Sequence, residues 1–171
     1  MKKIVIVITA LFACIGSLSA QKIGYINTED ILGGIPAYVS AQTQLNTLSD
    51  KYRASIETEL GKIESLYQEY QASRNSMSAA QRQNAENEII QKERVVQEKQ
   101  KIYFGEDGIM AKRAEELIGP IRKAVDKAIE EVARQGGYDL IIDLASMPGV
   151  VYKNSALDLS ARVLARYQEN Q

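Results

Sequence analysis

The chain has 171 residues, of which 45% are hydrophobic and 25% charged, and its formal net charge is −1. This is the length of one domain and the composition of a globular protein, which argues against a membrane bundle or a disordered chain. There is no His or Trp, and the single Cys is Cys14. Imidazole chemistry is therefore excluded, and thiol chemistry is excluded as well if the N-terminal segment is removed.

The first twenty residues predict an exported protein. The positively charged pair Lys2-Lys3 precedes the apolar run 4–15 and a stretch of small residues that ends at Ala20. This order is typical of a secretory signal peptide, and the apolar run is shorter than the roughly twenty residues of a membrane-spanning helix. We expect a signal peptide over 1–20, cleaved after Ala20.

An alternative interpretation concerns Cys14. The residues 11–14, Leu-Phe-Ala-Cys, approximate a lipoprotein signal, in which Cys14 would be acylated and would anchor the protein to a membrane. If Cys14 leaves with the signal peptide, residues 21–171 contain no cysteine and form no disulfide. They carry 19 basic and 22 acidic residues, a net charge of −3, so no basic excess predicts nucleic acid as a partner.

A short strand and a very long helix are predicted next. Residues 22–28 contain β-branched and aromatic side chains and predict a strand. Pro36 stands where a helix begins, because proline is well tolerated at the first helical position. From 37 to 104 there is no proline and one glycine, Gly61. This composition predicts helix.

Apolar residues in the first part of this helix are three or four positions apart, which predicts a coiled-coil-like stripe. The stripe consists of Tyr38, Ala41, Leu45, Leu48, Tyr52, Ile56, Leu60, Ile63, Leu66 and Tyr70. It ends at the Ser- and Asn-rich segment 73–78, where we expect the tip of a hairpin. Ser78 and Gln81 have the spacing of a capping box and predict the start of the returning helix.

The returning helix carries Ala85, Ile89, Val96, Tyr103 and Met110 on one stripe, diluted by Lys92 and Lys99. We expect it to be kinked or restarted at Gly119-Pro120, with Gly105 and Gly108 as weaker interruptions. The remaining predicted elements are a helix over 121–133 ended by Gly136-Gly137, a strand over 139–143 buried on both faces, a strand over 150–152, and a helix over 158–168.

The predicted fold class is α+β: a small strand-containing body and a long antiparallel coiled-coil-like helical hairpin. The body comprises 21–36 and 119–171, and the hairpin comprises 37–118 with its tip near 75–78. So small a body without disulfides is marginally stable, and strands with open edges can complete a sheet across subunits. The sequence therefore predicts oligomerisation. The residues expected at the oligomer interface are Ile23, Tyr25, Leu140, Ile141, Ile142, Val150, Val151 and Tyr152.

No constellation of residues predicts catalysis, a metal or a cofactor. Asp139 and Asp143 bracket a strand, and we expect them to cap the strand ends and to meet a basic residue such as Arg122 or Lys153. There is no phosphate-binding glycine loop and no nucleophile motif. The chain is therefore predicted not to be an enzyme.

Two hairpin residues are candidates for contacts with another protein. Tyr67 offers a rigid apolar face with a polar tip, and Met77 at the expected tip is flexible and polarisable. Tyr52 and Tyr70 are expected instead to fill the seam between the two helices.

The order of elements and three sequence segments resemble the Skp/OmpH family of periplasmic chaperones. The segments are 22–27 (Lys-Ile-Gly-Tyr-Ile-Asn), the long hairpin, and the C-terminal part with 138–143, 150–152 and 158–164. The resemblance implies a homotrimer with a shared barrel-like core and helical tentacles around a cavity. It also implies a periplasmic, ATP-independent holdase that binds unfolded outer-membrane proteins.

The hairpin charge departs from the family pattern of basic tentacles. Residues 37–118 contain 11 basic and 13 acidic residues. For that reason lipopolysaccharide is not carried over as an expected partner. The competing hypothesis is a structural or scaffolding coiled-coil protein of the cell envelope that binds one folded partner. A second continuous apolar stripe on the hairpin would favour the scaffold.

Overall fold

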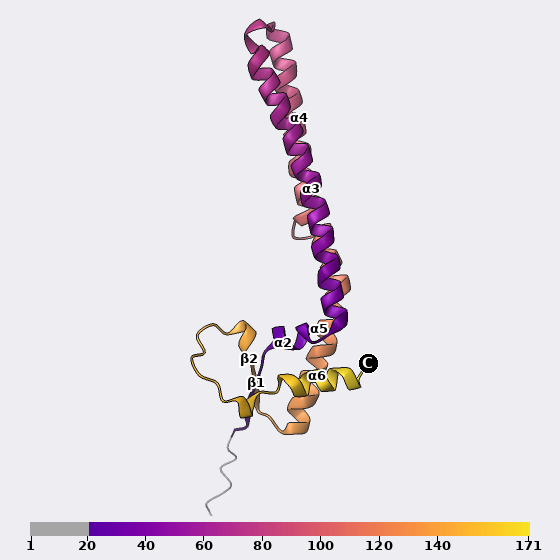
Figure 1. Ribbon diagram of the computed structural model, residues 1–171, viewed down its shortest axis with the longest axis vertical. Helices are drawn as coiled ribbons and strands as arrows, with labels where there is room; N and C mark the ends of the chain where they lie inside the picture. Colours follow the sequence, from indigo (N-terminus) through magenta and orange to yellow (C-terminus); the bar gives the residue numbers. More distant parts are fainter. Residues whose placement is uncertain (1–20) are drawn as a thin grey trace, which may run out of the picture. The chain divides into compact units, whose positions relative to one another are not determined.

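The structure is a computed structural model, and it describes residues 21–171 (Figure 1). The predicted signal peptide at 1–20, with Cys14, lies outside the described residues. The elements in chain order are β1 (Ile23–Ile26), α2 (Thr28–Gly33), α3 (Pro36–Ser73), the short 3-10 helix η1 (Arg74–Ser76), α4 (Ala79–Phe104), α5 (Ile109–Gly136), β2 (Leu140–Asp143), the 3-10 helices η2 (Leu144–Ser146) and η3 (Ser155–Leu157), and α6 (Ser160–Glu169).

The described chain divides into two compact units. One contains residues 21–31 and 127–171, and the other contains residues 32–126. The division expected from the sequence, with a body of 21–36 and 119–171, lies near this one but is not identical to it. The first unit holds both strands and α6, and the second holds the hairpin.

A two-stranded parallel sheet lies in the first unit. β1 pairs with β2 in the register Ile23↔Leu140 to Ile26↔Asp143, and Tyr25 forms an isolated bridge with Asp158. Because the strands are parallel, the chain between them must cross over, and here that connection includes the whole hairpin. The helix α6 contributes Val163 and Tyr167 to the buried residues of this unit. Together with β1, these residues explain how both ends of the described chain form one small core.

The two strand-bracketing aspartates have structural roles, as expected, but their partners are not the predicted Arg122 or Lys153. Asp139 Oδ2 accepts a hydrogen bond from the Lys22 backbone N–H at 2.7 Å. Asp143 accepts from the backbone N–H of Thr28 at 3.1 Å, from its hydroxyl at 2.7 Å, and from the Ala145 N–H at 3.0 Å. Backbone donors satisfy these carboxylates at the strand ends, so no basic side chain is needed.

Stability of the first unit should depend on the ionised Asp143 carboxylate. Burial raises its pKa, but the hydrogen bonds from Thr28 and Ala145 outweigh this effect, so the pKa lies below the ordinary 3.8. A lowered pKa contributes stability above the unfolded-state pKa, and this contribution is lost as the pH falls through the folded-state value. Asp143→Asn is expected to cost about 1–2 kcal/mol at neutral pH.

Urea unfolding followed by circular dichroism at pH 7, 5 and 3 checks this prediction. The difference between wild type and Asp143→Asn should be full at pH 7 and should shrink at pH 3. The exposed Asp126 provides a matched control, Asp126→Asn, with little expected effect at any of these pH values. A difference that stays constant from pH 7 to pH 3 contradicts the proposed role of the ionised carboxylate.

In the second unit, α3 and α4 form an antiparallel hairpin (Figure 1). The long helix α3 has 38 residues, which corresponds to a length of ~57 Å. Pro36 occupies its first turn, as predicted. At the other end, α3 stops at Ser73, and the predicted capping box is present: Gln81 N–H donates to Ser78 Oγ, and the Ser78 N–H donates to Gln81 Oε1. Residues at the helix ends thus determine where the hairpin begins, at Pro36, and where its returning helix begins, after Ser78.

Removal of the capping hydroxyl is expected to loosen the tip. Ser78→Ala leaves the Gln81 N–H without its partner, which costs about 1 kcal/mol. Hydrogen exchange should become faster for the amides of residues 79–82 and remain unchanged near Ala41. Ser65→Ala, which also removes an exposed helix hydroxyl but no cap, is the matched control. Equal exchange at the tip in both variants would contradict the capping role.

The main interruption in the returning arm lies at the weaker of the two predicted positions, near Gly105 and Gly108, and not at Gly119-Pro120. α4 ends at Phe104 and α5 begins at Ile109, whereas α5 continues through Pro120 without ending. Pro120 has no N–H, so one hydrogen bond to the Glu116 carbonyl is missing, and the helix tolerates this loss. At the interruption, Gly105 is extended with ψ 169°. The expected restart of the helix at Gly119-Pro120 was therefore wrong, whereas the weaker interruption expected at Gly105 and Gly108 is confirmed.

Two further expectations about the C-terminal part differ from the structure. The residues 150–152 form no strand in this chain. The strand β2 is not buried on both faces, since Leu140 is 50% exposed. By contrast, α5 ends at the predicted glycine pair, and Gly137 adopts the left-handed φ of 63° that favours glycine. An apolar strand and an apolar segment thus remain uncovered within the single chain.

Candidate functional site

One edge of the small sheet is open in the described chain. The strand β1 has a neighbour on each side, namely β2 and the bridge at Asp158, whereas β2 pairs only with β1 among residues 21–171. An unpaired strand edge presents free N–H and C=O groups that can pair with another chain. The β2 residue Leu140 is also half exposed, so this edge offers both unpaired backbone groups and apolar surface.

An exposed apolar segment follows this edge in the sequence. Val151 is 99% exposed and Tyr152 is 83% exposed, and Met147 and Val150 are also exposed. Isolated exposed hydrophobic residues are ordinary, but a run of several is not. The segment 147–152 is therefore a candidate contact surface, and the sequence had indicated three of its residues.

The eight residues predicted at an oligomer interface have different environments. Tyr25 is buried, Ile141 and Ile142 are half-buried, and the others are exposed: Ile23, Leu140, Val150, Val151 and Tyr152. The exposed members are accessible to a second chain, whereas Tyr25 belongs to the core of its own unit. Their role at an interface stays a prediction.

The Tyr25 hydroxyl is a buried polar group without a hydrogen-bond partner among the described residues. Burial raises the pKa of this hydroxyl, and the nearby Asp158 carboxylate raises it further. The Lys153 ammonium lies 5.3 Å from the centre of the Tyr25 ring. The sequence did not indicate this grouping, because Tyr25 and Asp158 come together only through the pairing of β1.

Two separate hydrophobic clusters hold the hairpin together. The outer cluster consists of Ile56, Ile63, Tyr70, Ile89 and Val96, with Leu66, Met77, Ala85 and Tyr103 packed against it. The inner cluster consists of Ala41, Leu45 and Ile118, with Tyr38, Met110, Ala114 and Leu117 packed against it. The predicted seam is thus present. Its tyrosines behave as expected: Tyr70 is buried, and Tyr52 stacks on Tyr103 with ring centres 4.1 Å apart.

Polar contacts across the hairpin are few and specific. The Tyr70 hydroxyl donates a hydrogen bond to Glu86, and this bond raises the tyrosine pKa. Lys99 Nζ lies 3.4 Å from Glu59 Oε1. The Lys99 hydrogen bond, together with the charge of Lys62, holds the Glu59 pKa below its ordinary value. Lys99, which dilutes the apolar stripe in the sequence, therefore pairs with an acid on the opposite helix.

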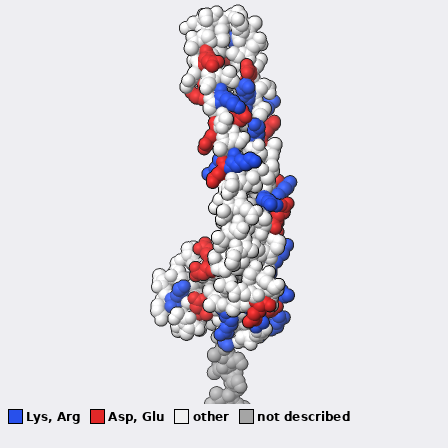
Figure 2. Space-filling model, turned by 45° about the vertical axis from the view of Figure 1, so that its right-hand side comes forward, with Lys and Arg blue, Asp and Glu red and all other residues white. Residues whose placement is uncertain are grey.

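The outer surface of the hairpin retains apolar side chains that nothing covers. Eight large hydrophobic residues of the hairpin are exposed: Val39, Leu60, Tyr67, Ile90, Val95, Ile102, Phe104 and Ile109. On the face shown in Figure 2, basic and acidic side chains are interspersed along the hairpin and neither sign forms a continuous patch. This arrangement offers separated apolar contacts within a charged, mixed surface.

The two candidate contact residues from the sequence fall in different places on the hairpin. Tyr67 is 47% exposed and belongs to neither cluster, so its ring is available. Met77 is half-buried and packs against the outer cluster, which limits its availability. Sequence reasoning missed Ile90, Ile102 and Phe104 as exposed residues, and it placed Leu60 in the seam although this residue is 45% exposed. The sequence shows that these residues are apolar, but it does not show which of them lie on the solvent-exposed face of the hairpin.

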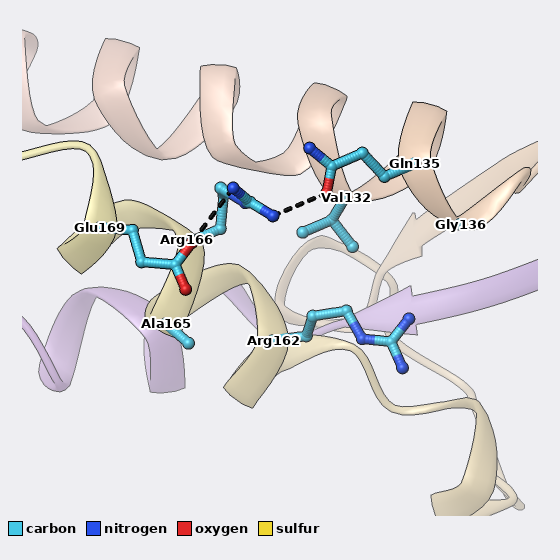
Figure 3. Close-up of a pocket in the computed structure, with 7 residues that line it drawn as sticks. All are labelled: Val132, Gln135, Gly136, Arg162, Ala165, Arg166 and Glu169. Carbon is cyan, nitrogen blue, oxygen red and sulfur yellow. Dashed lines mark hydrogen bonds and ion pairs between the residues drawn. The ribbon is translucent and has the colours of Figure 1, made fainter.

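A cavity of about 310 Å³ lies between the end of α5 and α6 (Figure 3). Arg166 points into it, donates to Gln135 Oε1 at 2.6 Å and lies 3.1 Å from Glu169 Oε2. The bond to Gln135 ties α6 to α5, the contact with Glu169 lies within α6, and the lining contains no nucleophile paired with a base. In the part of the chain that the structure describes, no group of three or more His, Cys, Asp or Glu side chains is arranged to hold a metal ion.

None of the helices within residues 21–171 combines the length and the apolar character needed to cross a membrane.

Comparisons with known proteins identify the family. The family model described as "Outer membrane protein (OmpH-like)" matches residues 22–167. The chaperone protein Skp of Photorhabdus luminescens is 31% identical over 159 residues, which covers 91% of this chain and 90% of that protein. The chaperone protein Skp of Yersinia enterocolitica is 28% identical over 156 residues, with 89% of each chain covered.

A solved structure shares the fold. An OmpH-like outer membrane chaperone of Caulobacter crescentus CB15 matches with a TM-score of 0.62 at 12% identity, covering 90% of this chain and 87% of that one. The predicted α+β fold with a long helical hairpin is thereby confirmed. The family match spans nearly all of the described chain, so the protein belongs to the OmpH-like family, together with the Skp chaperones.

Proposed function

We propose that this protein is an ATP-independent holdase chaperone of the periplasm that binds unfolded outer-membrane proteins and prevents their aggregation. The relatives named Skp chaperones support the class, and the signal-peptide pattern at 1–20 supports the compartment. The observation that carries the proposal is the series of exposed apolar side chains along the hairpin, set among charges of both signs. The proposal includes no catalytic step, no cofactor and no nucleic acid.

The mechanism follows from many weak contacts. An exposed side chain such as Tyr67 or Leu60 gains only part of its burial energy when a mobile chain passes over it. Several such contacts hold one client together while each of them forms and breaks quickly. The client stays separated from other clients and leaves when it folds elsewhere, because folding lowers its free energy further. Mass action suffices for release, without a nucleotide.

The proposal includes assembly as a homotrimer. A second copy that pairs with the open edge of β2 would satisfy its free backbone groups and cover Leu140. The segment 147–152 would supply additional apolar area to the same contact. Three hairpins carried by one assembly would surround a client from several sides, which raises their effective concentration around it.

Light scattering on residues 21–171 tests assembly and holding in one experiment. The protein is measured alone and after a urea-denatured outer-membrane barrel protein has been diluted into the same buffer. We expect a mass three times that of one chain, and a soluble complex containing one client. A threefold mass beside an aggregating, unbound client contradicts the holdase and retains the assembly. A single-chain mass contradicts the assembly.

One observation favours a second candidate, a scaffold that binds a folded partner through the hairpin. Val95, Ile102 and Ile109 recur at seven-residue intervals, and all three are exposed. In an uninterrupted helix, such spacing would place them on one face, which a partner helix could cover. The series is interrupted at 105–108, where α4 has ended, and Glu88 and Glu116 stand at the next positions in either direction. The interruption favours transient clients.

A further inference from the structure

We propose that Gln21 becomes the N-terminal residue of the exported chain and closes there into a pyroglutamate ring. In this modification the α-amino nitrogen of Gln21 attacks the Cδ atom of its own side-chain carboxamide. The new bond joins the α-nitrogen to Cδ, the bond between Cδ and Nε2 breaks, and one ammonia leaves with a proton taken from the α-amine. The reaction needs no oxidant, metal or cofactor. The proposal rests on cleavage after Ala20, as the sequence predicts, and not on the binding of clients.

The first observation is that the fold leaves Gln21 free. This residue is exposed, lies outside β1, and forms no hydrogen bond with any other residue of the described range 21–171. Ring closure requires the side chain to turn back toward its own α-amine, so a contact that held the carboxamide elsewhere would slow the reaction. Because both reacting groups belong to one residue, they meet at a high effective concentration.

The second observation is that the chain is fixed immediately after Gln21, at Lys22. The Lys22 N–H donates to Asp139 Oδ2 at 2.7 Å, and the Lys22 carbonyl accepts from the Asp139 N–H at 2.9 Å. Lys22 Nζ donates to the Gly136 carbonyl at 2.7 Å and lies 4.5 Å from the centre of the Tyr138 ring. This ammonium therefore lies at the C-terminal end of α5, where the helix dipole favours a positive charge.

The ring is compatible with the contacts of Lys22. Ring closure uses only the α-nitrogen and the side chain of Gln21, and it leaves the peptide bond between Gln21 and Lys22 unchanged. The Lys22 N–H therefore still reaches Asp139. An α-amine reacts only in its neutral form, and roughly a tenth of ordinary α-amines are neutral at pH 7. The fold thus neither blocks the reaction nor is disturbed by its product.

The ring protects a terminus that the fold uses. Proteolysis concentrates at chain ends, and aminopeptidases act on a free α-amine. Successive removal of Gln21 and Lys22 would delete the contacts that join the start of β1 to Asp139 and to the end of α5. A pyroglutamate has no free α-amine and no terminal positive charge. A purified aminopeptidase should therefore remove the first residue of the Gln21→Ala variant and leave the cyclised chain intact.

The mass of the exported protein tests the modification. The full chain from Met1, with a C-terminal affinity tag, is expressed in a bacterium and purified from the periplasm. We expect the mass of a chain that starts at residue 21, lower by one ammonia, and fragment masses that place the loss on Gln21. Gln21→Ala is the matched control and should show no such loss. A cut at another position, an acylated Cys14, or a Gln21 that stays open after days at neutral pH overturns the proposal.

The rate of ring closure tests the structural part of the argument. Residues 21–171 are released from a fusion so that Gln21 comes first, and the loss of ammonia is followed by mass in the folded chain and in a peptide of residues 21–30. Because the fold leaves Gln21 free, the two rates should agree within about threefold. A larger slowing in the folded chain overturns the proposal. The Gln21→Ala variant should hold an unfolded client as well as wild type, so failure of the ring and failure of the holdase are separate results.

Discussion

The variant Leu140→Asp is expected to lose its assembly and to remain a single chain. Leu140 lies on the open edge of β2 and is half exposed in the chain itself, so the substitution disturbs little within one subunit. In an assembly that covers this edge, the carboxylate would be buried without a partner, which costs several kcal/mol, about 2–5 at each interface. Light scattering should report a mass of one chain instead of three.

Val151→Asp provides an independent test of the same interface. Val151 is almost fully exposed in the chain, so its replacement has no expected cost to the isolated fold. Ile90→Asp is the matched control, because Ile90 is an exposed apolar residue of the hairpin and lies outside the sheet. The control should keep the threefold mass. A threefold mass for both Leu140→Asp and Val151→Asp refutes the assignment of this edge to the interface, whereas dissociation of the control would indicate that any added charge disrupts the protein.

The elements that the sequence predicts well are those determined by neighbouring residues. Pro36 begins α3, Ser78 and Gln81 form a capping box, and Gly137 ends α5, since in each case a local backbone requirement selects the residue. The seam between α3 and α4 was predictable from helical spacing alone. The family resemblance added the fold and the class, which the spacing by itself does not supply.

The two possible interruptions of the returning arm were ranked in the wrong order because two local signals competed. Proline at 120 removes one hydrogen bond, which a helix can lose when its packed face holds it, and Ile118 and Val125 on either side are buried. The connection between Gly105 and Gly108 instead uses close backbone approach, which only glycine allows. The sequence alone indicates that helix formation is weak at both positions. It does not indicate at which of them tertiary packing keeps the helix continuous.

Contacts between distant segments lay outside what sequence patterns can reach. Asp143 meets Thr28 across 115 positions of the chain, and Asp139 meets Lys22 across 117. Likewise, an apolar triplet in a strand predicts burial but not which molecule provides the cover. In β2 the single chain leaves Leu140 half exposed and Ile141 and Ile142 only half-buried. The exposure of each predicted interface residue therefore has to be known before it can be judged accessible to a second chain.

Replacement of three exposed hairpin residues by serine is expected to abolish most of the client holding. The variant combines Leu60→Ser, Tyr67→Ser and Ile90→Ser, all of which lie outside the buried clusters. If each side chain contributes about 1 kcal/mol through partial burial against a client, their joint loss is ~3 kcal/mol. This corresponds to a Kd that is roughly 100-fold weaker. The measurement is light scattering from a diluted unfolded barrel protein, titrated with each variant.

A matched variant separates apolar contact from general surface change. Glu57→Ser, Glu64→Ser and Gln91→Ser alter three exposed polar residues on the same two helices, close to the three apolar ones. Because these side chains offer little apolar area, the control should hold clients nearly as well as wild type. Both variants should keep the assembled mass, since none of the substitutions lies on the sheet edge. If the two variants lose holding equally, the exposed apolar residues are not the client contacts, and the binding surface must be sought elsewhere on the hairpin.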